Sequence, residues 1–214
     1  MKPVLTAVVA PIDRTDVDTD AILPKQYLRS IEKTGYGGFL FDEWRHLDPG
    51  DLGRGNQQRR LNESFVLNQP RYRDAGILLC RQNFGSGSSR EHAVWAILES
   101  GFQVLIAPSY GDIFANNCYK NNVLPIVLPE GDVDHLFQRV ESTPGYQLTV
   151  DVPEQVVKTP EGDVFPFEIG GFHKRCLLEN LDEISYALRY APLIRDFEAR
   201  RRVEAPWLFV DFSE

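Results

Sequence analysis

The stretch NFGSGSSREH, residues 83–92, decides the fold because it joins two segments of different periodicity. Before it, Gly76–Arg81 (GILLCR) is a short apolar run typical of a buried strand, and after it AVWAILESG has the pattern of a helix. The order is therefore strand, glycine-rich turn, helix. Gly85 and Gly87 allow positive φ angles in the turn and a close approach of the backbone to a ligand.

The end of this turn has the features of a helix start. Ser88 and Glu91 fit a capping box, with Ser88 as the N-cap, and Gly101 lies where the glycine that ends a helix is expected. A turn of this kind presents free amide N–H groups and a helix N-terminus. Both favour an anion such as a carboxylate or a phosphate.

Arg90 points to a bound carboxylate. A guanidinium in the first turn opposes the helix dipole, whereas its planar fork suits the two oxygens of a carboxylate. Ser88 and Ser89 would then lie beside that carboxylate. These residues alone leave a second interpretation open, in which Ser88 only caps the helix and Arg90 only pairs with a surface acid.

The rest of the chain alternates strands with helices, which predicts an α/β fold with a parallel sheet. Ligands in such sheets bind at the carboxyl ends of the strands, where the turn at Gly85–Ser89 falls. Further strands are predicted at Pro3–Ala10, Gln103–Ala107 and Leu124–Leu128, with antiparallel strands between Gln147 and Phe167. A short helix or a loop is predicted at Ile113–Asn121, and helices at Gly131–Val140, around Leu181–Leu188 and before Arg200–Arg202.

Composition narrows the class of protein. The chain has 214 residues, 43% of them hydrophobic, and a net charge of −8. The negative charge argues against nucleic acid as a partner, and no apolar run reaches the roughly 18 residues of a membrane span. The N-terminus lacks a convincing signal-peptide pattern, so we expect a cytoplasmic protein. The three cysteines and four histidines are dispersed, which indicates reduced thiols and no metal site built from this chain.

Asp16, Asp18 and Asp20 resemble the opening of a calcium-binding EF-hand loop. The later positions of that loop require a glycine and a glutamate, and here they are Ala21 and Tyr27. We therefore expect a turn held by Asp and Thr side chains instead.

The segment Lys25–Arg45 combines three closely spaced glycines with many apolar and aromatic side chains. The glycines make a stable helix improbable and indicate a mobile segment. Its side chains either cover the core or form a lid over a substrate. The candidates for contacting a substrate are Leu28, Ile31, Tyr36 and Phe39.

Taken together, NFGSGSSREH, VDTDAILPKQYL (residues 17–28), TGYGGFLFDEWR (34–45) and VLIAPSYGDIFANNCYKNNVLPI (104–126) closely resemble the swivelling domain of the aconitase superfamily. The surroundings resemble the small-subunit family of bacterial 3-isopropylmalate dehydratase. The resemblance covers most of the chain in the family's order. It implies a three-layer β/β/α swivelling domain with a mainly parallel central sheet and C-terminal helices, and a single domain over residues 1–214 with a C-terminal helical extension.

The resemblance also implies an activity. The family interconverts 2-isopropylmalate and 3-isopropylmalate by dehydration and rehydration in leucine biosynthesis, as a hydro-lyase active only with its large subunit. Ser88 corresponds to the base, acting as an alkoxide, while Ser89, Arg90 and Gly87 bind the small dicarboxylate substrate. Thr19 and Asp20 are expected near the substrate.

The Lewis acid of the reaction is missing from this chain. In the family it is a [4Fe-4S] cluster held by the separate large subunit, so we expect half an active site, completed in a heterodimer or higher heteromer. In aconitase an arginine in the region corresponding to Lys25–Arg45 recognises a carboxylate of citrate. Here the matching part of the segment is glycine and aromatic, which fits an isopropyl group. Arg29 lies in the same segment and leaves recognition of a carboxylate there open.

Three other functions remain as alternatives. The first is a related hydro-lyase subunit for 2-methylmalate, 2,3-dimethylmalate or a homoaconitate-type acid. The second is a non-catalytic regulatory subunit, against which the intact Ser88 and Arg90 argue. The third is dinucleotide binding through Gly85 and Gly87, but Arg90 stands where that fingerprint has a small residue.

Overall fold

The computed structural model describes residues 1–29, 32–52 and 59–209. It forms two compact units, Met1–Asn180 and Leu181–Glu214, which we call the body and the C-terminal unit. No helix in the described part is long and apolar enough to cross a membrane.

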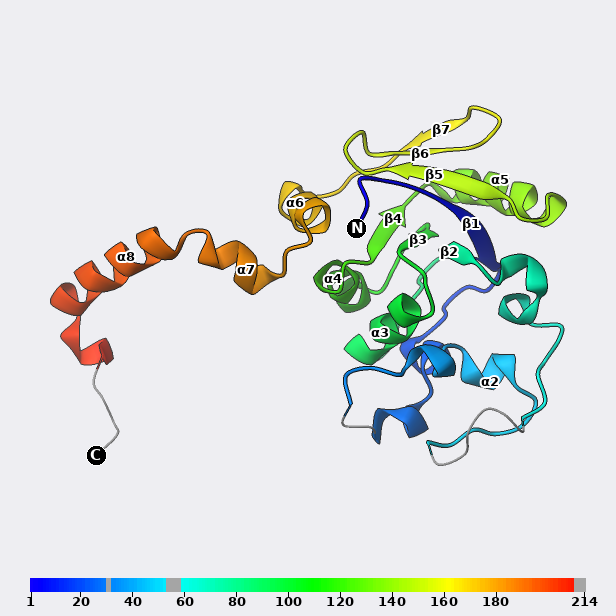
Figure 1. The fold of residues 1–214 in the computed structure, drawn as a ribbon, viewed down its shortest axis with the longest axis horizontal. Coiled ribbons are helices and arrows are strands. Elements are labelled where there is room, and N and C mark those ends of the chain that lie inside the picture. The colour runs from blue at the N-terminus through cyan, green and yellow to red at the C-terminus, as the bar shows by residue number, and fades with distance from the viewer. Residues whose placement is uncertain (30–31, 53–58, 210–214) are drawn as a thin grey trace. The chain divides into compact units, whose positions relative to one another are not determined.

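The body is built on one seven-stranded sheet with the strand order β4-β3-β2-β1-β5-β6-β7 (Figure 1). The first four strands in that order are parallel and the last three are antiparallel. Every predicted strand is confirmed, and so are the α/β class and the C-terminal helices. The strands are β1 (Val4–Ile12), β2 (Ala75–Cys80), β3 (Val104–Ala107), β4 (Leu124–Val127), β5 (Gln147–Asp151), β6 (Val156–Lys158) and β7 (Val164–Pro166).

Helices cover the parallel half of the sheet. The helices α3 (Glu91–Glu99) and α4 (Asp112–Lys120) connect β2 to β3 and β3 to β4, and right-handed crossovers place both on one face. The other face is covered by α5 (Glu130–Ser142), which packs on β1, β2 and β3 (Figure 1). The body also contains α1 (Thr19–Ile22), α2 (Asp42–Arg45), α6 (Gly171–Glu179) and the 3-10 helices η1 (Lys25–Arg29), η2 (Gly37–Phe39), η4 (Val66–Asn68) and η5 (Pro70–Tyr72).

The core explains why the central strands are apolar without alternation. Ile77, Leu78 and Leu79 of β2 have no exposed surface, and all four residues of β3 are equally buried. A parallel sheet with helices on both faces buries both sides of its strands. The helix α3 contributes Ala93, Val94, Ala96 and Ile97 to this core.

The predicted capping box is wrong. The helix α3 begins at Glu91, and its N-cap is Arg90, which has an extended backbone and makes no capping bond. The carboxylate of Glu91 instead accepts a hydrogen bond from Asn121 Nδ2 at 2.8 Å, which ties α3 to the end of α4. Gly101 does follow the helix in a left-handed conformation, with φ +97°, as predicted.

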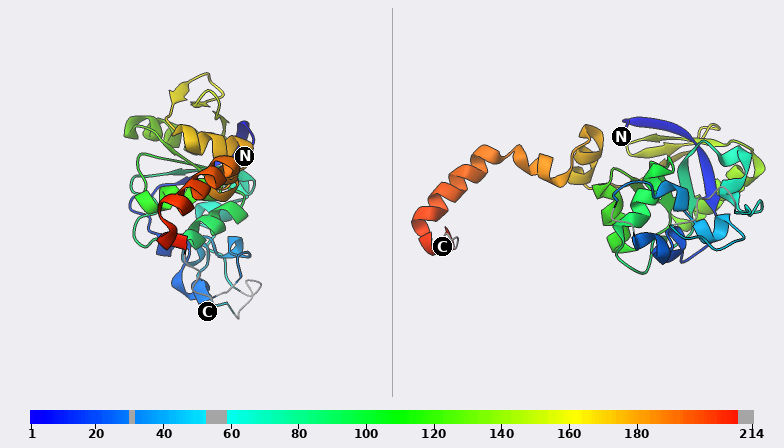
Figure 2. Two further views of the ribbon diagram at one scale, coloured as in Figure 1. Left: turned by 90° about the vertical axis from the view of Figure 1, so that its left-hand side faces the viewer. Right: turned by 60° about the horizontal axis from the view of Figure 1, so that its bottom comes forward.

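The C-terminal unit contains the helices α7 (Glu183–Leu188) and α8 (Ala191–Glu204) and the 3-10 helix η6 (Pro206–Phe209) (Figure 2). Both α helices were predicted. No residue of either helix is buried.

A candidate active site at the carboxyl ends of the parallel strands

The loops that follow β1, β2 and β3 meet at the carboxyl edge of the parallel strands. Asp18 pairs with Ser86 as an isolated parallel bridge, and Phe84 pairs with Tyr110 in the same way. The amide of Gly85 donates to Val17 O at 2.7 Å. These backbone bonds fix the glycine-rich turn against residues 16–20, which we call the D-T-D loop after Asp18, Thr19 and Asp20. The predicted site residues from two distant segments therefore lie together.

Two glycines give the turn its shape. Gly85 has φ +73° and Gly87 has φ +87°, as predicted. A Cβ on Gly85 would lie 2.1 Å from Cγ of Phe114, the ring that α4 packs under the turn. A Cβ on Gly87 would meet only Asp18 Cβ, at 3.4 Å. Gly85 is therefore required by both conformation and space, and Gly87 by conformation.

The side chains of Ser88 and Ser89 are exposed directly before α3. Arg90 Nη2 donates a hydrogen bond to Ser88 Oγ at 3.3 Å. Thr19 is buried, and its hydroxyl donates to the carbonyl of Ser88 at 3.0 Å. The structure thus holds the Ser88 backbone from one side and sets a guanidinium beside its hydroxyl.

Arg90 forms an ion pair with Asp20, the last acid of the D-T-D loop. Lys25 reaches the other oxygen of the same carboxylate, with Nζ 3.3 Å from Oδ2. Arg90 is therefore paired with an acid, but that acid belongs to the predicted site. A ligand carboxylate that binds Arg90 must share the guanidinium with Asp20 or take its place, and Lys25 remains as a partner for Asp20.

The other two acids of the D-T-D loop have separate tasks. Asp16 accepts a hydrogen bond from Asn83 Nδ2 at 2.7 Å, and this bond lowers the pKa of the Asp16 carboxyl. Asp18 caps α1 by accepting from the amide of Ala21 at 2.7 Å. Asp18 thus makes the expected bond to a local backbone amide, whereas Asp16 bonds a side chain of the glycine-rich turn. Across the described residues, no group of three His, Cys, Asp or Glu side chains is placed to hold a metal ion.

The predicted specificity segment, Lys25–Arg45, packs against the rest of the body. Tyr36 is buried edge-on against the ring of His92, with centroids 5.3 Å apart, and Phe39 stacks on Tyr27 at 4.0 Å. Leu28 is half-buried against the core, and Ile31 lies outside the described residues. Tyr36 therefore covers the core, and a role of this segment in substrate selection stays a prediction.

Sequence reasoning missed Glu99, which anchors this segment. Its two carboxylate oxygens accept from the amides of Gly35 at 3.0 Å and Gly37 at 2.8 Å, and Ser100 Oγ donates to Gly37 O at 3.0 Å. A glutamate in the last turn of a helix opposes the helix dipole, and this was the available signal. The glycine segment is thereby fastened to the end of the helix that begins at the candidate site.

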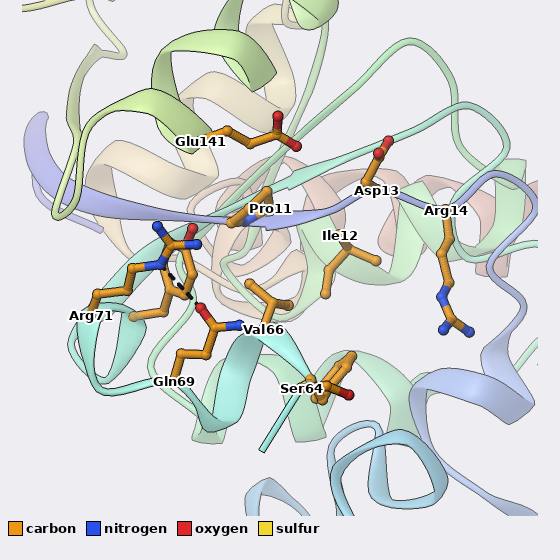
Figure 3. A pocket seen from close by; sticks show the side chains of 11 residues that line it. Pro11, Ile12, Asp13, Arg14, Ser64, Val66, Gln69, Arg71 and Glu141 are labelled. Carbon is orange, nitrogen blue, oxygen red and sulfur yellow. Dashed lines mark hydrogen bonds between the residues drawn. The ribbon is translucent and has the colours of Figure 1, made fainter. Parts of the chain in front are cut away.

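A cavity of about 380 Å³ adjoins the site and is lined by Asp20, Pro24, Lys25, Glu43 and Trp44 among others. A second cavity, of about 290 Å³, lies between the end of β1 and the 3-10 helices η4 and η5 (Figure 3). It is lined by Ile12, Val66, Arg71 and Glu141 among others. None of the predicted site residues lines this second cavity.

The three cysteines are buried, and Cys80 and Cys118 are free thiols. Burial raises the pKa of the Cys80 and Cys118 thiols well above the usual value. A thiol kept protonated in this way is a poor nucleophile and a poor metal ligand. These residues therefore belong to the core, not to the site.

The fold and the loop constellation define an aconitase-type domain, and comparison with known families agrees. Residues 4–131, more than half of the chain, match the model of the aconitase C-terminal domain. Residues 134–171 match the model LeuD_N, and residues 184–211 match the model of the C-terminal domain of the 3-isopropylmalate dehydratase small subunit. The chain therefore belongs to the aconitase C-terminal domain family. Within it, the chain falls among the small subunits of 3-isopropylmalate dehydratase, as the sequence predicted.

A solved structure supports the fold. The crystal structure of 3-isopropylmalate dehydratase (leuD) from Methanocaldococcus jannaschii is similar with a TM-score of 0.60 and 23% sequence identity. The match covers 91% of this chain and 99% of that chain. At this identity the likeness shows the shared fold alone.

Proposed function

We propose that this chain supplies the base and the carboxylate-binding groups of a hydro-lyase that interconverts 2-isopropylmalate and 3-isopropylmalate, completed by a large subunit with a [4Fe-4S] cluster. The observation that carries the proposal is the placement of Ser88 Oγ, exposed and 3.3 Å from Arg90 Nη2. A cytoplasmic location is part of the proposal, since Cys80 and Cys118 are free thiols.

In the first step, Ser88 would remove a weakly acidic proton from the carbon next to a substrate carboxylate. A serine hydroxyl ionises far above neutral pH, so an alkoxide needs positive charge close by. The Arg90 guanidinium supplies it, and the start of α3 adds the positive end of a helix dipole. Ser88 Oγ would hold the proton during dehydration and return it during rehydration at the neighbouring carbon.

The expulsion of hydroxide requires a Lewis acid. The iron–sulfur cluster of the large subunit would supply it when bound. No described cysteine of this chain is exposed for such a role, because Cys80, Cys118 and Cys176 are buried. The donor set of this chain therefore does not fit the cluster, which supports a site divided between two subunits.

Substrate recognition rests on Arg90 and Ser89. We propose that a substrate carboxylate binds the Arg90 fork while Asp20 shifts toward Lys25, its second partner in the structure. The exposed Ser89 hydroxyl would donate to the same carboxylate. Thr19 keeps the Ser88 backbone in place throughout.

The test is consumption of 2-isopropylmalate, under anaerobic conditions, by this chain alone, by a reconstituted large subunit alone, and by the mixture. We expect turnover only in the mixture, and a loss of about 10²- to 10⁴-fold in kcat for Ser88→Ala. Ser86→Ala is the matched control, because Ser86 lies in the same turn and uses its backbone carbonyl to hold Thr19.

Two outcomes would change the proposal. Full activity of Ser88→Ala would remove the base role and favour a non-catalytic subunit. A complex that forms but leaves 2-isopropylmalate untouched would direct attention to 2-methylmalate, 2,3-dimethylmalate and homoaconitate-type acids.

A further inference from the structure

The C-terminal unit exposes an unusual amount of apolar surface. Ten large apolar side chains between residues 181 and 209 are exposed, from 36% for Phe209 to 84% for Val203. Single exposed apolar side chains are normal, but a concentration of them in one short segment marks an interaction surface.

Four of these side chains form one stripe along α8. Tyr190, Leu193, Ile194 and Phe197 are spaced i, i+3, i+4 and i+7, which places them on one face of a helix. Ala199 lies on the opposite face by the same geometry. The helix is therefore amphipathic around a defined apolar stripe, although none of its residues is buried.

The exposed area is large enough for a stable interface. At roughly 80–100 Å² for each half-exposed large side chain, ten of them present about 800–1,000 Å². A standard protein–protein interface buries about 800 Å² per partner. The four side chains of the stripe present about 320–400 Å² of this area, so a complete interface would also need the neighbouring apolar side chains of α7 and η6.

The matched families indicate which partner this is. The aconitase C-terminal domain model ends at residue 131 and, by its name, describes a domain joined to a longer chain. The segment 184–211 matches instead a domain specific to a dehydratase small subunit. A domain in the same chain is held near its neighbour by the linkage, whereas a separate subunit must be held by contacts.

We infer that the α8 stripe docks into an apolar groove of the large subunit and takes the place of the covalent link. This inference rests on the proposed function, because it requires a large subunit that completes the site. The contact that holds the two subunits together would then lie outside the Ser88 site. The affinity of this chain for the large subunit and the turnover of the complex could therefore be changed separately.

A second copy of this chain is a less favourable occupant. Each copy of the chain has a net charge of −8, which opposes the approach of a second copy. The chain's own body is a third occupant, and the thermal measurement below distinguishes it from the large subunit.

The test compares Leu193→Glu and the double variant Leu193→Glu/Phe197→Glu with Ala199→Glu, which adds the same charge as Leu193→Glu to the opposite face of α8. Affinity for the reconstituted large subunit is measured by anaerobic titration, and kcat is measured with the large subunit in excess. We expect the double variant to raise Kd by on the order of 100-fold. Its kcat with saturating large subunit stays within about twofold of wild type, and Ala199→Glu behaves as wild type in both measurements.

Several results would overturn the inference. Wild-type affinity in the double variant would show that the stripe is not the docking surface. A loss of self-association, measured by light scattering, with unchanged binding to the large subunit would assign the stripe to a second copy. A Tm of the isolated chain lowered by the double variant but not by Ala199→Glu would assign it to the chain's own body.

The two proposals fail in different ways. Ser88→Ala should bind the large subunit with wild-type affinity and lose turnover. A wild-type complex that forms through the stripe without turning over isopropylmalate would refute the proposed substrate and leave the docking inference standing. Failure of the wild-type chain to bind the large subunit at all would refute the docking inference directly.

Discussion

Replacing Gly85 by alanine should damage the turn that carries Ser88. The new Cβ would lie 2.1 Å and 2.3 Å from two carbons of the Phe114 ring, which is 3% exposed and also packs edge-on against Phe84. Overpacking of this kind costs about 1–3 kcal/mol. A side chain at φ +73° adds about 1–2 kcal/mol of backbone strain. We expect the free energy of unfolding to fall by about 2–5 kcal/mol.

Gly101→Ala separates the two contributions. Gly101 has φ +97°, and a Cβ there meets nothing within 4 Å, so this variant should lose only the strain of about 1–2 kcal/mol. Urea denaturation of both variants, followed by circular dichroism, gives the difference. The substitution Phe114→Leu removes the ring that the new Cβ would strike, so Gly85→Ala is also measured in a Phe114→Leu background. The cost of Gly85→Ala should be smaller there, as a double-mutant cycle would measure.

Gly85→Ala should lower activity as well as stability. A displaced turn moves Ser88 Oγ relative to Arg90, so Gly85→Ala should also reduce kcat in the assembled enzyme, whereas Gly101→Ala should not. Equal destabilisation by Gly85→Ala and Gly101→Ala, or a cost of Gly85→Ala that is unchanged in the Phe114→Leu background, would refute the role assigned to the Phe114 contact.

Three further predictions concern the body. Glu99→Ala should speed hydrogen exchange at the amides of Gly35 and Gly37. Glu99→Gln should have an intermediate effect, because it keeps one acceptor oxygen. Unchanged exchange in Glu99→Ala would show that the carboxylate does not anchor the segment. Hydrogen bonds from Arg60 lower the pKa of the Asp48 carboxyl from 3.8 to about 2. The ionised carboxylate therefore stabilises the folded state fully above pH 3.8, and this stabilisation is lost as the pH falls toward about 2. The shift in urea midpoint between about pH 5 and about pH 2.5 should therefore be smaller in Asp48→Asn than in wild type, and an identical shift would contradict this assignment. Finally, none of the three buried thiols should react rapidly with a thiol reagent in the native chain, while all three should react in urea; one fast thiol in the native state would contradict the burial of these residues.

The elements of the fold follow from local patterns. The continuous apolar runs predicted β2, β3 and β4, because a parallel sheet covered on both faces has no polar side to alternate with. The sequence also predicted the helix α5 and a helix before Arg200–Arg202, where α8 lies. The positive φ angles of Gly85 and Gly87 were also predictable, since glycine carries no penalty there.

The start of α3 was not predictable from its local pattern. Ser88 and Glu91 have the spacing of a capping box, yet Glu91 bonds Asn121 from the next connection, and Arg90 becomes the N-cap. A contact 30 residues away along the chain replaced the local bond. Propensity and spacing describe only neighbours, so tertiary partners of this kind override them.

The candidate site likewise combines features that the sequence predicts with contacts that only the tertiary structure shows. The sequence by itself determined which residues we propose for the chemistry, because Ser88, Arg90 and the glycines of the turn are local features of one loop. Only the tertiary structure decided that Asp20 faces Arg90, that Thr19 holds the Ser88 carbonyl and that Glu99 fastens the glycine segment. Each of these pairs joins residues more than 60 positions apart. Such contacts depend on how strands order in the sheet, which no pattern within a single segment encodes.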